Sequence, residues 1–112
     1  MKIIVPLVAP GMNQIRAMHF HAYRRLRDVW QRTIWALVGR QKRLMGKVNV
    51  SIHVEHSRLY DPDNLVGCAK IPLDCLVRLG IIPTDTPEHL TLSVTQEKSK
   101  EKQTTITLEG QR

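Results

Sequence analysis

Hydrophobic and polar positions alternate most regularly over residues 48–55, where every second residue is valine or isoleucine. Alternation of this kind predicts a β-strand with one buried face and one exposed face. Shorter β-branched or leucine-containing runs at residues 3–8, 90–94 and 106–108 predict three further strands. The polar segment 97–102, between the last two runs, predicts a hairpin turn.

Two other segments have apolar residues at intervals of three and four, which is typical of a helix with one buried face. The first covers about residues 13–38 and is ended by Gly39. The second covers residues 63–79, and we expect Pro72 to kink or interrupt it, because proline removes a helical hydrogen bond. The apolar stripe predicted for the first helix comprises Ile15, Met18, Ala22, Leu26, Val29, Thr33 and Leu37.

The resulting order of elements is strand, helix, strand, helix, strand, strand. It predicts an α+β fold in which one mixed β-sheet packs with two helices. A length of 112 residues and a hydrophobic fraction of 42% indicate a single globular domain over residues 1–112. No apolar run reaches the roughly 18 residues that a membrane-spanning helix needs. Residues 1–7 make a poor signal peptide, because Pro6 breaks a short apolar run.

The two cysteines, Cys68 and Cys75, would lie about 10 Å apart along one helix, which is too far for a disulfide. We therefore expect two buried thiols in a reducing, cytoplasmic environment. His53 and His56 do not combine with these cysteines in the spacing of any usual zinc finger, so the sequence gives little support for a zinc site.

Positive charge is concentrated in the first part of the chain. Residues 1–47 hold ten Lys and Arg and one acid, whereas residues 48–112 hold seven Lys and Arg and nine acids. A net charge of +7 with this asymmetry favours a nucleic-acid partner, although a solvated basic helix face is the plainer alternative. The candidate phosphate contacts are Arg24, Arg25, Arg40, Lys42, Arg43 and Arg58.

The most informative stretch runs from Tyr60 to Leu65 and reads Tyr-Asp-Pro-Asp-Asn-Leu. Its two carboxylates, Asp61 and Asp63, follow directly after a predicted strand. Carboxylates on such a turn suit Mg²⁺, which usually takes one or two of them together with water and phosphate. The same residues are also good turn and helix-cap residues, so Asp61 or Asp63 could simply cap the following helix with Pro62 in its first turn.

This stretch and the two blocks after it resemble the RusA family of Holliday junction resolvases. The first block is Asp61, Asp63, Asn64 and Leu65; the second is Lys70, Asp74 and Leu76; the third is Gly80, Ile81, Ile82 and Asp85. The resemblance implies a metal site formed by Asp61, Asp63 and Asp85, and a lysine, Lys70, that is needed for cleavage. Asn64 and Asp74 are expected to support these groups.

The resemblance further implies a crossover junction endodeoxyribonuclease. Such an enzyme uses Mg²⁺, with Mn²⁺ as a possible substitute, and cuts Holliday junctions or other branched DNA in recombination and repair. A homodimer is expected, since a four-way junction offers two symmetric strands. The place of action would be the cytoplasm of a bacterial or phage-infected cell.

Two departures from the family pattern leave a second interpretation open. Thr84 stands where the family usually has another aspartate, and the spacing from Asn64 to Lys70 is longer than in the short form of the motif. The alternative is therefore a catalytically silent, DNA-binding relative with the same fold. A small phage or host scaffold protein is a third, weaker possibility.

Lys70 and Asp74, four residues apart, would share one helix face, where they could also form only a surface ion pair.

Overall fold

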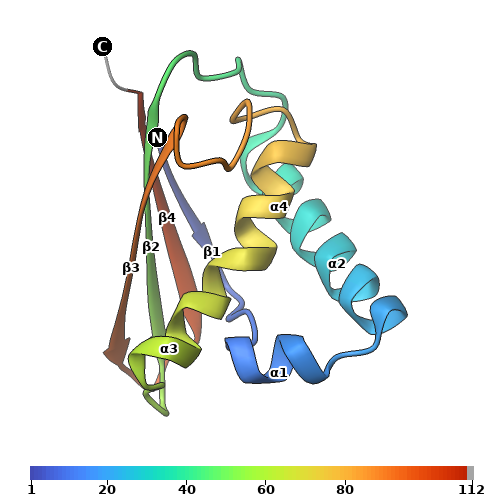
Figure 1. The fold of residues 1–112 in the computed structure, drawn as a ribbon, viewed down its shortest axis with the longest axis vertical. Helices are drawn as coiled ribbons and strands as arrows, with labels where there is room; N and C mark the ends of the chain where they lie inside the picture. Colours follow the sequence, from blue (N-terminus) through green and yellow to red (C-terminus); the bar gives the residue numbers. More distant parts are fainter. Residues whose placement is uncertain (111–112) are drawn as a thin grey trace.

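A four-stranded mixed sheet with helices packed on one of its faces forms the molecule, and the computed structural model describes residues 1–110 of the chain (Figure 1). The strands lie in the order β1-β4-β2-β3, with β2 antiparallel to β4 and parallel to β3. The predicted α+β class with one mixed sheet is confirmed. The strands are β1 (Lys2–Val5), β2 (Val48–His56), β3 (Leu90–Lys98) and β4 (Gln103–Gly110).

The predicted hairpin between the last two strands is wrong. β3 and β4 are consecutive in the chain, but β2 lies between them and pairs with both. The inward residues of β2 are fully buried, whereas β3 exposes Leu92, so the more apolar strand occupies the interior of the sheet. The connection after β3 crosses the end of β2, where the backbone N–H of Ser99 donates to the carbonyl of His56 at 2.9 Å.

The two faces of the sheet differ sharply in chemistry. The inner face is apolar and is covered by the helices, and its buried residues include Ile3, Val5, Val48, Val50, Ile52, Val54, Ile106 and Leu108. The outer face carries mainly serine, threonine, asparagine and glutamate side chains from β2, β3 and β4. Within residues 1–110 no helix covers this outer face (Figure 1).

The single helix expected over residues 13–38 is divided into α1 (Met12–Ala17) and α2 (Phe20–Val38). His19 caps the second helix by accepting a hydrogen bond from the N–H of His21 on its Nδ1 atom. The buried residues of α2 are Trp30 and Ile34, while Val29 and Leu37 of the predicted stripe are exposed. The stripe was therefore placed partly on the wrong face of α2.

The helix expected over residues 63–79 consists of α3 (Pro62–Leu65), a 3₁₀ segment η1 (Val66–Ala69) and α4 (Lys70–Arg78). The interruption falls before Pro72, which sits in the first turn of α4, where a missing N–H costs little. Gly67 explains the position of η1. A Cβ atom on Gly67 would lie 2.1 Å from the backbone nitrogen of Met12, so α1 packs directly against the backbone there.

Both cysteines are free and buried, as predicted. The thiol of Cys68 in η1 donates to the carbonyl of Ala9, and that of Cys75 in α4 donates to the carbonyl of Arg27. Burial raises the pKa of the Cys68 thiol to about 11 and that of Cys75 to about 12, so both thiols are protonated at neutral pH. None of the helices in the described part of the chain is long and apolar enough to cross a membrane.

Candidate functional site

A polar groove of about 740 Å³ opens where β2 ends. It brings together segments that are far apart in sequence: the end of β1, the start of α1, the loop after β2, and the β3–β4 connection. Its charged lining residues are Arg58, Asp61 and Lys102, and its polar lining includes Asn13, His56 and Asn64. Two cations facing one carboxylate make the groove suited to a ligand that carries both phosphate and a metal ion.

Gln96 of β3 holds the loop that leads into the acidic motif. Its side-chain amide donates to the carbonyl of Tyr60 at 2.6 Å, and its side-chain oxygen accepts the N–H of Tyr60 at 2.9 Å. The same oxygen is 3.0 Å from Nε2 of the buried His56, whose ring packs edge-on against the ring of Tyr60. These bonds fix the backbone one residue before Asp61, so the sheet sets where the Asp61 backbone lies.

Asp61 occupies the N-cap position of α3, with Pro62 directly after it. Its backbone carbonyl accepts the N–H groups of Asn64 and Leu65. Within residues 1–110, however, its side chain makes no capping hydrogen bond, and both Asp61 and Asp63 are exposed. The plain capping interpretation therefore accounts for the backbone of Asp61 but not for its carboxylate, which remains available to a ligand.

Asn64 anchors α1 against this motif. Its side-chain oxygen accepts the N–H of Asn13 at 2.9 Å, and a Cβ atom on Gly11 would lie 2.5 Å from that oxygen. Asn13 also borders the smaller hollow beside Asp63, which Arg16 lines as well. Asn64 thus links the acidic motif to α1, and its partner Asn13 lines both the groove at Asp61 and the hollow at Asp63.

Lys70 and Asp74 both meet Tyr23 of α2. The Lys70 ammonium lies 5.9 Å from the centre of the Tyr23 ring, and the Tyr23 hydroxyl donates a short hydrogen bond to Asp74. Burial, together with the adjacent Asp74, raises the pKa of the Tyr23 hydroxyl. The two residues share a helix face as expected, but no ion pair joins them among the described side chains, so Asp74 positions Tyr23 rather than Lys70 directly.

Asp85 lies away from the other two predicted metal ligands. It lines a hollow of about 270 Å³ with Arg27, Asp74, Val77 and Arg78, near the end of α4. Asp61 and Asp63 lie at the start of α3, and Figure 1 shows these two places at opposite ends of the helical run 62–78. Within one copy of the chain, the three carboxylates therefore do not converge on a common ion, and none of them belongs to the one group of potential metal ligands found in residues 1–110.

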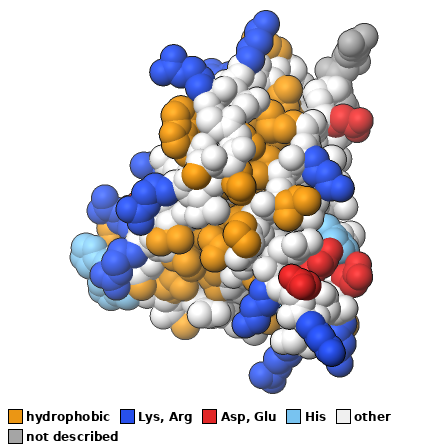
Figure 2. Space-filling view, turned by 180° about the vertical axis from the view of Figure 1, so that it is seen from behind, with side chains coloured by type: hydrophobic (Ala, Val, Ile, Leu, Met, Phe, Trp, Pro, Cys, Tyr) orange, Lys and Arg blue, Asp and Glu red, His pale blue; other side chains and the backbone are white. Residues whose placement is uncertain are grey.

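The candidate phosphate contacts are spread along the molecule. Arg24 and Arg25 are exposed on α2, and Arg40, Lys42 and Arg43 are exposed in the connection from α2 to β2. That connection is bonded to the segment after α4, since the N–H of Leu44 donates to the carbonyl of Ile81. Figure 2 shows Lys and Arg side chains along one side and at both ends of one face, with hydrophobic side chains between them. Only Arg58 of the predicted set lines the groove.

Sequence reasoning missed Gln96 and Lys102. Both reach the groove because β3 lies parallel to β2 and its following loop crosses the end of β2, a pairing that the local pattern did not indicate.

Neither the models of known protein families nor any curated protein matched the chain when compared with it. The likeness to the RusA family therefore rests on the residue pattern between Asp61 and Asp85.

Proposed function

We propose that the protein is a Mg²⁺-dependent endonuclease that cuts four-way junctions or other branched DNA in the cytoplasm. The observation that carries this proposal is the carboxylate of Asp61, which projects from backbone bonded to the sheet, is not used for helix capping, and lines a groove with Arg58 and Lys102. The motif that resembles the RusA family supplies the reaction class.

The residues at the start of α3 fit a Mg²⁺ ion. Asp61, at the N-cap of α3, and Asp63, in its first turn, are both exposed and line neighbouring hollows, so each can offer one of the one or two carboxylates that Mg²⁺ commonly takes from a protein. Such an ion, when bound, supplies Lewis-acid stabilisation of the phosphodiester and a more acidic water. Mn²⁺ is the expected substitute, because carboxylate and water ligands suit it equally.

The remaining groups of the proposed site bind and orient DNA. Arg58 and Lys102 flank the groove and would contact phosphates on either side of the cleaved bond. Lys70, exposed at the start of α4, would stabilise the charge that develops on the phosphate during cleavage. Gln96 and Asn64 hold the two backbone segments from which Asp61 and Asp63 project.

A homodimer is part of the proposal, since a four-way junction presents two equivalent strands. Helix α2 offers a surface for a second copy. It exposes several large apolar side chains, while its neighbouring arginines keep the rim charged: the exposed apolar residues are Phe20, Val29, Trp35 and Leu37.

The second candidate is a DNA-binding relative that does not cleave. The placement of Asp85 favours it, because this carboxylate lies with Arg27 and Arg78 and away from Asp61. Thr84, in place of an acid, removes a further charge from that segment. A silent relative would keep the basic surface and the groove but would lack a complete metal site.

A cleavage assay on a synthetic four-way junction, with and without Mg²⁺, separates the two candidates. We expect the unmodified protein to cut only with Mg²⁺ or Mn²⁺. Asp61→Asn and Asp63→Asn should each abolish cutting but retain junction binding, since a lost negative charge lowers repulsion of phosphate.

Asp28→Asn is the matched control, because Asp28 is an exposed acid on α2 away from the groove. Full cleavage by Asp61→Asn would overturn the assignment of the site. Tight junction binding by the unmodified protein without any metal-dependent cutting would establish the silent relative instead.

A further inference from the structure

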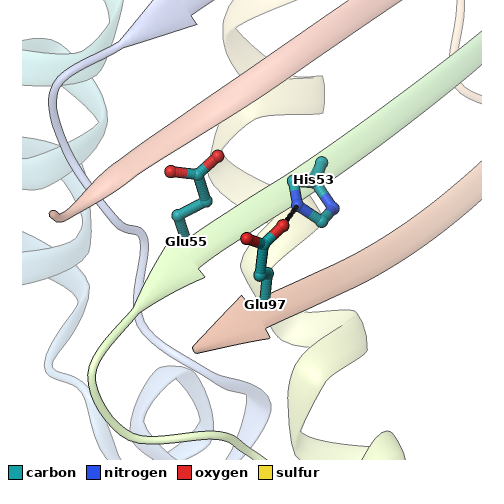
Figure 3. A group of neighbouring side chains, drawn as sticks. All are labelled: His53, Glu55 and Glu97. Carbon is teal, nitrogen blue, oxygen red and sulfur yellow. Dashed lines mark hydrogen bonds and ion pairs between the residues drawn. The ribbon is translucent and has the colours of Figure 1, made fainter. Parts of the chain in front are cut away.

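Three potential metal ligands meet on the uncovered outer face of the sheet, independently of the groove. His53 and Glu55 project from β2, and Glu97 projects from β3 beside them (Figure 3). One ligand atom from each lies within 4.8 Å of the other two. Nε2 of His53 is 3.3 Å from a carboxylate oxygen of Glu97.

The register of the sheet creates this group. His53 and Glu55 are two residues apart on β2, so they point to the same face. In the parallel pairing, Glu55 lies opposite Glu97 and His53 lies opposite Thr95. All three ligands thus stand on two adjacent strands, the central strand β2 and the edge strand β3. The paired backbone holds them more rigidly than a loop would.

Thr95 fixes the histidine ring in an orientation that suits metal binding. Its hydroxyl lies 2.7 Å from Nδ1 of His53, so Nδ1–H can donate to the hydroxyl oxygen. With a metal ion bound, this tautomer would leave the lone pair of Nε2 free to bind the ion between the two carboxylates. Metal-bound histidines usually have their other ring nitrogen engaged in this way, which orients the ring and strengthens the ligand.

The two glutamates are directly opposite each other across the strands, an arrangement that is unfavourable for like charges. Of the two, Glu97 contacts Nε2 of His53 at 3.3 Å, and no ion pair with Lys or Arg involves either glutamate among the described residues. A divalent cation between the carboxylates would offset their repulsion.

We propose that His53, Glu55 and Glu97 form a binding site for a divalent transition-metal ion, with Zn²⁺ as the best match. One imidazole and two carboxylates suit Zn²⁺, whereas Mg²⁺ prefers oxygen ligands alone. Three protein ligands on an open sheet face leave at least one coordination position for water or another molecule. This site shares no residue with the groove at Asp61.

Equilibrium dialysis of the purified protein against Zn²⁺ tests the proposal. We expect saturable binding that is lost in His53→Gln, in Glu55→Gln and in Glu97→Gln. Glu109→Gln is the matched control: Glu109 is an exposed outer-face glutamate on β4, opposite Asn49 near the start of β2. Asp61→Asn should also leave Zn²⁺ binding unchanged, so the outcome does not depend on the proposed nuclease activity.

Thr95→Val gives a finer test, because it removes only the hydroxyl that orients the ring. We expect this variant to weaken Zn²⁺ binding by about 10- to 100-fold, the usual effect of losing such a partner. In the wild-type protein, histidine NMR signals should show one ring shifting on addition of Zn²⁺, and His53→Gln should remove that signal. Equal Zn²⁺ binding by the wild type and all three ligand variants, or no binding by the wild type, would overturn the proposal.

Discussion

The two ends of the helical run from Pro62 to Arg78 carry acidic residues in very different settings. At the first end, the backbone before Asp61 is bonded to Gln96, and Gly67 lies in backbone contact with α1. At the other end, Asp85 lies on an exposed turn whose bonds are mostly local, from the N–H of Thr86 to the hydroxyl of Thr84 at 3.4 Å and from the N–H of His89 to the carbonyl of Thr86 at 2.9 Å. A site that must hold a ligand in fixed geometry is better supported at the first end.

This difference shows why a sequence motif and a site are not the same thing. Asp61 and Asp85 belong to one residue pattern, yet the run formed by α3, η1 and α4 lies between them in the chain and they line separate hollows. The contacts that hold the backbone around Asp61 come from β3 and α1. The comparison predicts that perturbing the first end will cost more, in stability and in activity, than perturbing the second.

The largest effect is expected for Gly67→Ala. The new methyl group would lie 2.1 Å from the nitrogen and 2.4 Å from the Cα atom of Met12, and backbone atoms cannot move aside as a flexible side chain can. We expect the free energy of unfolding to fall by about 3 kcal/mol or more, as overpacking of a tight contact does. Urea denaturation followed by circular dichroism measures it.

Gly110→Ala is the control, because a Cβ atom there meets nothing within 4 Å. It should change the urea midpoint very little. Equal stability of Gly67→Ala and the wild type would mean that α1 does not pack against η1 as described.

The next effect concerns the two aspartates themselves. We expect Asp61→Asn to lower Mg²⁺-dependent junction cleavage by more than the about 10- to 100-fold that the loss of an outer-sphere group produces. Asp85→Asn should be milder, because its carboxylate lies beside Arg27 and Arg78 at the other end of the run. Cleavage rates over a range of Mg²⁺ concentrations compare the two variants. An equal loss in both would show that Asp85 reaches the same ion, for instance from a second copy of the chain.

A smaller effect is expected from the basic residues at the two ends. Charge reversal of Arg58 and Lys102 should weaken DNA binding and cleavage together, since both line the groove. Reversal of Arg40, Lys42 and Arg43 should weaken binding alone. Each lost phosphate contact with duplex DNA flattens the log–log dependence of affinity on salt by about 0.9. An unchanged slope in the triple variant would mean that the loop is only a solvated surface.

The strands were predictable because their signal is local. In β2 the alternation from Val48 to Val54 corresponds residue by residue to buried and exposed positions. Strand partners were not predictable in the same way, because the crossover through α3 and α4 places β3 parallel to β2, and the β3–β4 connection then carries β4 to the other side of β2. The contact of α1 with Gly67 was missed for a similar reason, since Met12 and Gly67 lie far apart in sequence.

The candidate site was predictable only in part. The turn chemistry of Asp61 and Pro62 indicated the start of a helix, and the structure begins α3 there. Gln96 and Lys102 were not predicted, because they enter the groove through the pairing of β3 with β2. His53 and Glu55 were visible as neighbours on one strand face, but their partner Glu97 is brought to them only by the parallel register.

The smallest expected effect uses the two buried thiols as probes of the two ends, with Cys68 near Asp61 and Cys75 farther along α4. Burial raises their pKa from 9.0 to about 11 and about 12, so the folded protein keeps these protons at a pH where the unfolded chain loses them. Their contribution to stability is therefore present below about pH 9 and is lost as the pH rises through 11 to 12. We expect the urea midpoint to fall between pH 8 and about pH 10, and to fall less in Cys68→Ala and in Cys75→Ala.

If the first end is the more rigid one, a thiol reagent at neutral pH should modify the Cys75→Ala variant, which retains Cys68, more slowly than the Cys68→Ala variant. The reverse order of rates would place the more rigid packing at the Asp85 end.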